Sequence, residues 1–129
     1  ICDDHYTCPK YTTKYRTLFK NSGPAAGDIE YIDYIDALEA IEKDGGFTVI
    51  AHPGQLQSYE LVDDSYRLID GLEKYHPDHG LVDYEKIDAL IEKYGFFITG
   101  GSDFHGDFGN YVEIGIDSEL LTDTIGLFR

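Results

Sequence analysis

Two short apolar segments constrain most strongly what this 129-residue chain can fold into. They are residues 47–50 (Phe-Thr-Val-Ile) and 96–99 (Phe-Phe-Ile-Thr). Runs this short, apolar and partly β-branched are typical of strands buried on both faces of a sheet. Helical patterns lie before, between and after them. The sequence therefore predicts an α/β fold with mostly parallel strands alternating with helices and joined by right-handed crossovers.

Periodicity and capping residues predict the other elements. Asp33 or Asp36 would cap a first helix that Gly45 ends, and Asp83 would cap a later helix that Gly95 ends. The predicted elements are helices near 34–43, within 58–69, at 83–94 and after Ser118, and strands at 47–51, 72–75, 96–99 and 111–117.

The first residues differ from the rest of the chain. Residues 1–28 carry turn signals at Pro9, at 21–24 and at Gly27, and they show little periodicity. We expect irregular or extended structure there, as at the end of an insertion. Residues 29–129 carry the alternating pattern and are expected to form the α/β domain.

The net charge of −15 at pH 7 limits the classes of partner. Binding to a nucleic-acid backbone draws most of its affinity from basic patches, so we do not expect it here. No apolar run approaches the ~20 residues of a membrane span, so we expect no membrane partner. A hydrophobic content of 42% is enough for a core, and the acidity suits a cytoplasmic protein with a largely solvated charged surface.

The two cysteines are a poor match to a metal clip. Cys2 and Cys8 lie six residues apart with His5 between them, whereas zinc clips use four ligands in tighter pairs. We expect two ordinary thiols, and a disulfide only under oxidising conditions.

Polar groups follow the two buried segments, where parallel α/β sheets place their chemistry. His52 precedes Pro53, whose ring favours extended geometry at His52. In Asp103-Phe104-His105 the carboxylate and the second imidazole are two residues apart, so on an extended chain both point to the same side. Imidazole and carboxylate together suit Zn, Mn or Fe, so the sequence predicts a shared metal site in which these side chains converge.

Taken together, these motifs resemble the PHP family, the polymerase and histidinol phosphatase superfamily of metal-dependent phosphoesterases. The resemblance covers roughly residues 18–129 and rests on 45–46, 49–54, 71–75 with His79, and 99–106. PHP proteins fold as a distorted seven-stranded β/α barrel with metal ions at the carboxyl ends of the strands. The resemblance therefore implies that the chain is the C-terminal portion of a distorted (β/α)7 PHP barrel.

The resemblance also implies a ligand set and a cofactor. It makes His52, Asp103 and His105 metal ligands, and it implies two or three divalent ions (Mn, Zn or Fe) in the full-length parent. Such ions would activate a water and polarise the phosphoryl oxygens of a substrate.

Further roles follow from the same resemblance. His79 is expected to orient the phosphate or to protonate the leaving group, and Arg16 and Lys20 are expected to bind the phosphate. His76 receives no role, because relatives more often have an aromatic or small polar residue there. Glu73, on a short strand, either faces the mouth of the barrel or pairs with a cation, and we favour a structural role.

Motifs that open PHP chains are absent here, namely His-x-His, an Asp-His pair and a metal-bridging Glu. The sequence begins at Ile1 without methionine, so we expect the C-terminal part of a longer protein whose missing N-terminal part is its partner. The isolated chain is expected to be inactive and to associate with itself through uncovered strand edges.

The predicted activity is hydrolysis of a small-molecule or nucleotide phosphate ester. Two alternatives stay open. One is an amidohydrolase-type metal hydrolase, which also clusters His and Asp at barrel strand ends. The other is a non-catalytic structural or regulatory fragment.

Overall fold

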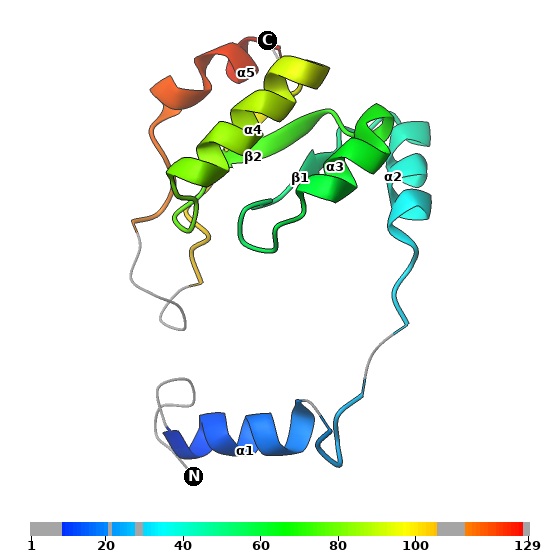
Figure 1. Ribbon diagram of the computed structural model, residues 1–129, viewed down its shortest axis with the longest axis vertical. Helices are drawn as coiled ribbons and strands as arrows, with labels where there is room; N and C mark the ends of the chain where they lie inside the picture. The colour runs from blue at the N-terminus through cyan, green and yellow to red at the C-terminus, as the bar shows by residue number, and fades with distance from the viewer. Residues whose placement is uncertain (1–8, 21, 28–29, 106–112, 128–129) are drawn as a thin grey trace. The chain divides into compact units, whose positions relative to one another are not determined.

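The computed structural model describes residues 9–20, 22–27, 30–105 and 113–127 (Figure 1). The chain forms two compact units, one of residues 1–31 with 105–110 and the other of residues 32–104 with 111–129. Cys2, His5 and Cys8 lie outside the described residues.

The first unit contains helix α1 (Pro9–Phe19). The irregular or extended structure predicted over 1–28 is therefore wrong for these residues. The turn signals that suggested it flank the helix, because proline suits the first helical position and 21–24 follow the last turn. No glycine or proline interrupts the residues between, so a helix forms despite weak periodicity. The domain border at 28/29 stays a prediction.

The second unit is built on a three-stranded parallel sheet in the order β1-β2-β3. Its strands are β1 (Val49–Ile50), β2 (Gly71–Tyr75) and β3 (Phe97–Gly100). Leu72 is paired with Ile50 on one side and with Ile98 on the other. The predicted parallel pairing is confirmed, and all three strands end at the same edge of the sheet.

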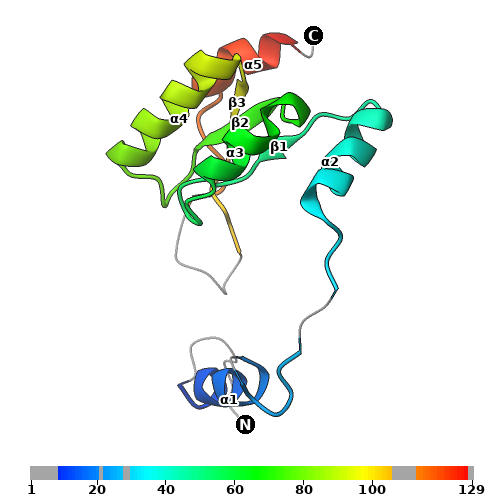
Figure 2. The same ribbon diagram turned by 45° about the vertical axis from the view of Figure 1, so that its right-hand side comes forward.

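Helices alternate with these strands and pack beside them. In this unit they are α2 (Tyr34–Lys43), α3 (Tyr59–Ser65), α4 (Leu81–Tyr94) and α5 (Thr122–Leu127), with 3-10 turns at Tyr66–Leu68 and Ser118–Leu121. Helix α4 packs on β2, and α5 contacts β3 (Figures 1 and 2). Among the described helices, none has the length and apolar character needed to cross a membrane.

The core lies around the central strand. Leu72 of β2 and Ile87 of α4 are fully buried. Full burial of such a side chain contributes about 1.5–3 kcal/mol. The buried apolar cluster consists of Val62, Ile69, Leu72, Ile87, Leu90 and Phe96.

Capping residues set the ends of α2 and α4. Asp33 Oδ1 accepts a hydrogen bond from the Ile35 N–H at 2.9 Å, which confirms Asp33 as the N-cap of α2. Helix α4 begins after Gly80, and Asp83 lies in its first turn with Oδ2 accepting the Gly80 N–H at 2.9 Å. The prediction of Asp83 as N-cap is thus wrong, because its carboxylate reaches back to the cap from within the helix. Gly95, at φ +77°, ends α4 as predicted.

The segment after β3 departs from the prediction. Residues 113–117 form no strand, so the strand predicted at 111–117 is wrong for its described part, and 111–112 lie outside the described residues. Gly115 interrupts any extended run, because its φ of +87° is left-handed. Asp117, not Ser118, caps the turn that follows, with Oδ1 accepting the Glu119 N–H at 2.9 Å.

Candidate functional site

Three histidines gather at the carboxyl ends of β1 and β2. His52 lies just beyond β1, His76 directly follows β2, and His79 comes three residues later. The ring centroids of His52 and His76 are 5.3 Å apart, and those of His76 and His79 are 5.2 Å apart. This is the edge of a parallel sheet at which α/β proteins place their chemistry.

Asp103, which follows β3, joins this group. Its Oδ2 lies 3.6 Å from Nε2 of His76. His52 and Asp103, which the sequence predicts to converge, therefore both lie beside the same third residue. His105 belongs to the first unit, so its convergence with His52 stays a prediction.

The backbone is strained at both of these positions. His52 has φ +30° and Asp103 has φ +48°, in a region that costs a non-glycine residue about 1–3 kcal/mol. The extended geometry predicted for both is therefore wrong. At His52 the chain enters a turn, in which the Gln55 N–H donates to the His52 carbonyl at 3.0 Å. Asp103 lies beyond the end of β3, where the chain has already left the sheet. Such strain clusters at functional sites.

Glu73 holds the end of β1 in place from the middle of β2. Its Oε2 accepts the main-chain N–H of His52 at 2.7 Å. A bond to a charged acceptor is stronger than one between neutral groups. The pairing of β2 with β3 becomes irregular between Glu73 and Tyr75. This hydrogen bond agrees with the structural role favoured for Glu73, because its carboxylate fixes the strained His52.

His79 is engaged by main chain on both ring nitrogens. Nδ1 lies 2.7 Å from the Lys74 carbonyl, and Nε2 accepts the Gly54 N–H at 3.2 Å. This pattern assigns the proton to Nδ1 and leaves neither nitrogen free in this state. The predicted action of His79 on a substrate stays a prediction, while its role in joining the loops after β1 and β2 is evident.

Gly54 permits this junction by its lack of a side chain. A Cβ there would lie 2.7 Å from Cδ2 of His79 and 2.8 Å from Cγ of Asp83. Asp83 is itself fixed, because Oδ1 accepts the Tyr59 hydroxyl at 2.7 Å. That bond and the Gly80 N–H hold the pKa of Asp83 below its ordinary value, and burial together with Asp83 raises the pKa of Tyr59.

His76, for which the sequence predicts no role, lies at the centre of the group. Its side chain is 1% exposed. A loop histidine next to proline looks like a solvated side chain, but here the rings of His52 and His79 pack beside it. The available signal was that histidines follow two neighbouring predicted strands at 52, 76 and 79.

The donor chemistry of the site fits a divalent metal. His52 Nδ1 is buried without a hydrogen-bond partner in the described part of the chain, which is unusual for a buried polar atom. Imidazole and the Asp103 carboxylate are suitable donors for Zn, Mn or Fe. However, across residues 9–20, 22–27, 30–105 and 113–127 no three His, Cys, Asp or Glu side chains are arranged to hold an ion. The ligand set is therefore incomplete within these residues.

The two predicted phosphate-binding residues belong to the first unit. Arg16 lies on α1, and Lys20 follows its end with Nζ 5.9 Å from the Tyr15 ring centre. Their contact with a phosphate stays a prediction.

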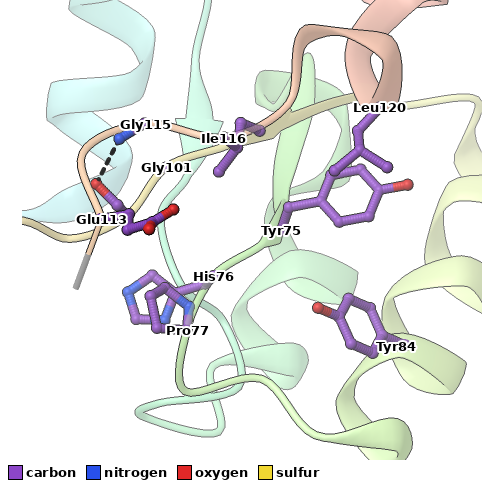
Figure 3. Close-up of a pocket in the computed structure, with 10 residues that line it drawn as sticks. Tyr75, His76, Pro77, Tyr84, Gly101, Glu113, Gly115, Ile116 and Leu120 are labelled. Carbon is purple, nitrogen blue, oxygen red and sulfur yellow. Dashed lines mark hydrogen bonds between the residues drawn. The ribbon is translucent and has the colours of Figure 1, made fainter.

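A pocket of about 370 Å³ opens beside His76, between the end of β2 and the segment after β3 (Figure 3). The Ser102 hydroxyl accepts the Gly115 N–H at 2.9 Å and so ties that segment to the wall. Rings, aliphatic groups and a carboxylate share the lining, which includes Tyr75, His76, Tyr84, Glu113, Ile116 and Leu120.

Similarity to characterised proteins points to hydrolases. No family model matches the chain. Over 116 residues it is 43% identical to the phosphoribosyl 1,2-cyclic phosphate 1,2-diphosphodiesterase of Eggerthella lenta, covering 89% of this chain and 44% of that protein. The chain thus spans less than half the length of this curated relative.

A solved structure resembles the fold. An amidohydrolase from Chromobacterium violaceum, with bound sulfate and no metal, superimposes with a TM-score of 0.56 and 26% identity. The match covers 82% of this chain and 40% of the amidohydrolase. The chain is therefore homologous to part of a phosphodiesterase and is similar in fold to part of an amidohydrolase.

Proposed function

We propose that this chain forms the C-terminal part of a PHP-type, metal-dependent phosphoesterase acting on small-molecule or nucleotide phosphate esters. The observation that carries the proposal is the grouping of His52, His76 and Asp103 at the ends of three neighbouring parallel strands. The 43% identity to a diphosphodiesterase favours phosphate esters and suggests a cyclic phosphodiester of a sugar phosphate as the first substrate to test.

In this proposal His52, Asp103 and His105 bind divalent metal, with Mn, Zn or Fe as the candidates. Ions held there would supply an activated water and would polarise the phosphoryl group. Two strained residues among these ligands support the assignment, since backbone strain is retained where function requires it. Further ligands would come from outside the described residues.

Substrate binding is assigned to three other residues and to the pocket. Arg16 and Lys20 would bind the phosphate, and His79 would orient it or protonate the leaving oxygen. His79 can do so only if a substrate atom replaces one of its main-chain bonds. The pocket beside His76, with aromatic and polar walls, suits the organic group of the ester.

We further propose that the remainder of a longer, cytoplasmic protein covers the sheet and completes the site. The relative is more than twice the length of the matched region. Parallel sheets are normally covered on both faces, yet Phe47 beside β1 is 63% exposed. Without that remainder, the chain would be inactive and would associate with itself.

The test compares the 129-residue chain with a longer protein that contains it. We expect the longer protein to hydrolyse phosphoribosyl 1,2-cyclic phosphate or p-nitrophenyl phosphate with Mn²⁺ or Zn²⁺, and the isolated chain to hydrolyse almost none. Asp103→Asn in the longer protein should abolish turnover, because it removes an anionic ligand. Unchanged turnover in this variant would remove Asp103 from the site.

One observation favours the alternative of an amidohydrolase-type metal hydrolase, since the similar solved structure is an amidohydrolase. A panel of amides and lactones therefore accompanies the phosphate esters. Preference for that panel would contradict the phosphoesterase proposal. Turnover of neither class would favour a non-catalytic structural or regulatory role.

A further inference from the structure

His76 is a buried imidazole with an unused polar atom. Its side chain is 1% exposed and lies between the rings of His52 and His79. Nε2 has no hydrogen-bond partner among the described residues. Buried polar atoms are nearly always satisfied, so this nitrogen needs an explanation.

The main chain fixes which nitrogen of His76 carries the proton. Nδ1 accepts the Asp78 N–H at 3.1 Å. A neutral imidazole that accepts at one nitrogen donates at the other, so the hydrogen-bond network assigns the proton to Nε2. A protonated Nε2 has no lone pair for a metal. His76 is therefore a donor, and it has the opposite tautomer to His79.

The carboxylate of Asp103 lies close to this donor. Its Oδ2 lies 3.6 Å from Nε2, so a small movement of the Asp103 side chain would bring the two atoms within hydrogen-bond distance. Asp103 is 38% exposed on a segment that has left the sheet, with a strained φ of +48°. The buried His76 imidazole is held by the Asp78 N–H, so it can fix the position of the more exposed Asp103 carboxylate.

We infer that His76 is a positioning residue, whose Nε2–H holds one oxygen of Asp103 and so directs the other towards bound metal. This inference rests on the proposed function, in which Asp103 is a metal ligand. Groups that orient metal ligands through hydrogen bonds typically change affinity or activity about 10–100-fold when they are removed.

Two matched variants separate donation from structural support. In His76→Gln the amide nitrogen keeps a donor near the position of Nε2. In His76→Asn the amide oxygen keeps an acceptor for the Asp78 N–H but loses the donor towards Asp103. A positioning role therefore predicts that His76→Gln preserves the environment of the Asp103 carboxylate. A purely structural role predicts instead that His76→Asn is the better tolerated of the two substitutions.

NMR of the metal-free 129-residue chain provides a readout independent of activity. We expect the ring ¹⁵N shifts of wild-type His76 to report a proton on Nε2, and Asp103→Ala to speed exchange of that proton with water. The Asp103 carboxyl ¹³C shift should be preserved in His76→Gln and changed in His76→Asn. A proton on Nδ1, unchanged exchange in Asp103→Ala, or a carboxyl shift equal in all three chains would overturn the inference.

Turnover of the longer protein gives the second readout. We expect about a 10–100-fold loss in His76→Asn and rescue in His76→Gln. If the longer protein lost bound metal to the same extent in His76→Gln and His76→Asn, His76 would be a metal ligand and the inference would be overturned. If no phosphate ester is hydrolysed, the proposed function fails, while the NMR comparison still decides whether His76 holds Asp103.

Discussion

Replacing Gly54 with alanine tests whether the loop after β1 is held by close packing against the loop after β2. Gly54 is buried and donates its N–H to Nε2 of His79 at 3.2 Å. A Cβ there would lie 2.7 Å from the His79 ring and 2.8 Å from Cγ of Asp83, whereas ordinary contact begins at 3.4 Å. One of these groups must therefore move.

Both neighbours are held by hydrogen bonds that such a movement would lengthen. His79 is held by the Lys74 carbonyl, and Asp83 by the Tyr59 hydroxyl and the Gly80 N–H. Overpacking a well-packed site costs about 1–3 kcal/mol. We expect Gly54→Ala to lower the free energy of unfolding by that amount, which is about a 5- to 150-fold change in the folding equilibrium.

Urea denaturation followed by circular dichroism measures this change. Gly126→Ala is the matched control, because a Cβ at Gly126 in α5 would meet no atom within 4 Å. We expect this control to gain about 0.4–1 kcal/mol from the reduced entropy of the unfolded chain. A Gly54→Ala chain as stable as the wild type would refute the reasoning that both loops are pinned.

Two further substitutions test hydrogen bonds of the site. Glu73→Ala should lower the free energy of unfolding, measured by urea denaturation, by about 1.5–3 kcal/mol, because the His52 N–H loses a charged acceptor. Glu73→Gln should lower it by less, and equal losses in the two variants would contradict a charge-assisted bond. Tyr59→Phe should destabilise the chain above the ordinary pKa of Asp83, 3.8, because the ionised carboxylate loses a donor. The stability difference between the wild type and Tyr59→Phe should shrink as the pH falls below 3.8 and the Asp83 carboxylate of the folded chain is protonated at its lowered pKa. Denaturation curves over a pH series measure this difference, and a difference that does not change with pH would contradict the prediction.

The sequence predicts a helix or strand well when the residues that indicate it lie within that element or at its ends. Helix α2 has the predicted range, since its repeating apolar residues, Asp33 and Gly45 all lie in one short stretch. The strands were placed by their apolar runs, although β1 is shorter than predicted. The helix α1 was missed because turn signals at its ends outweighed the uninterrupted residues between them.

The site was less predictable, because contacts between distant segments create it. His52 and Asp103 were selected by their place after buried strands, and their approach to a common neighbour agrees with that reasoning. No sequence pattern reports that Glu73 holds the His52 N–H or that both ligand candidates have left-handed backbones. The burial of His76 likewise depends on rings that come from another strand end.

The shortness of β1 has a consequence for native-state fluctuations. Among the residues that the structure describes, only Val49 and Ile50 belong to its ladder and both are paired with β2 on one side, whereas β2 is held from both sides. Strands with so few backbone bonds open locally at a small fraction of the global unfolding free energy. Amide deuteration should therefore spread from β1 while β2 stays protected, and each such opening would withdraw His52 while leaving His76 in place.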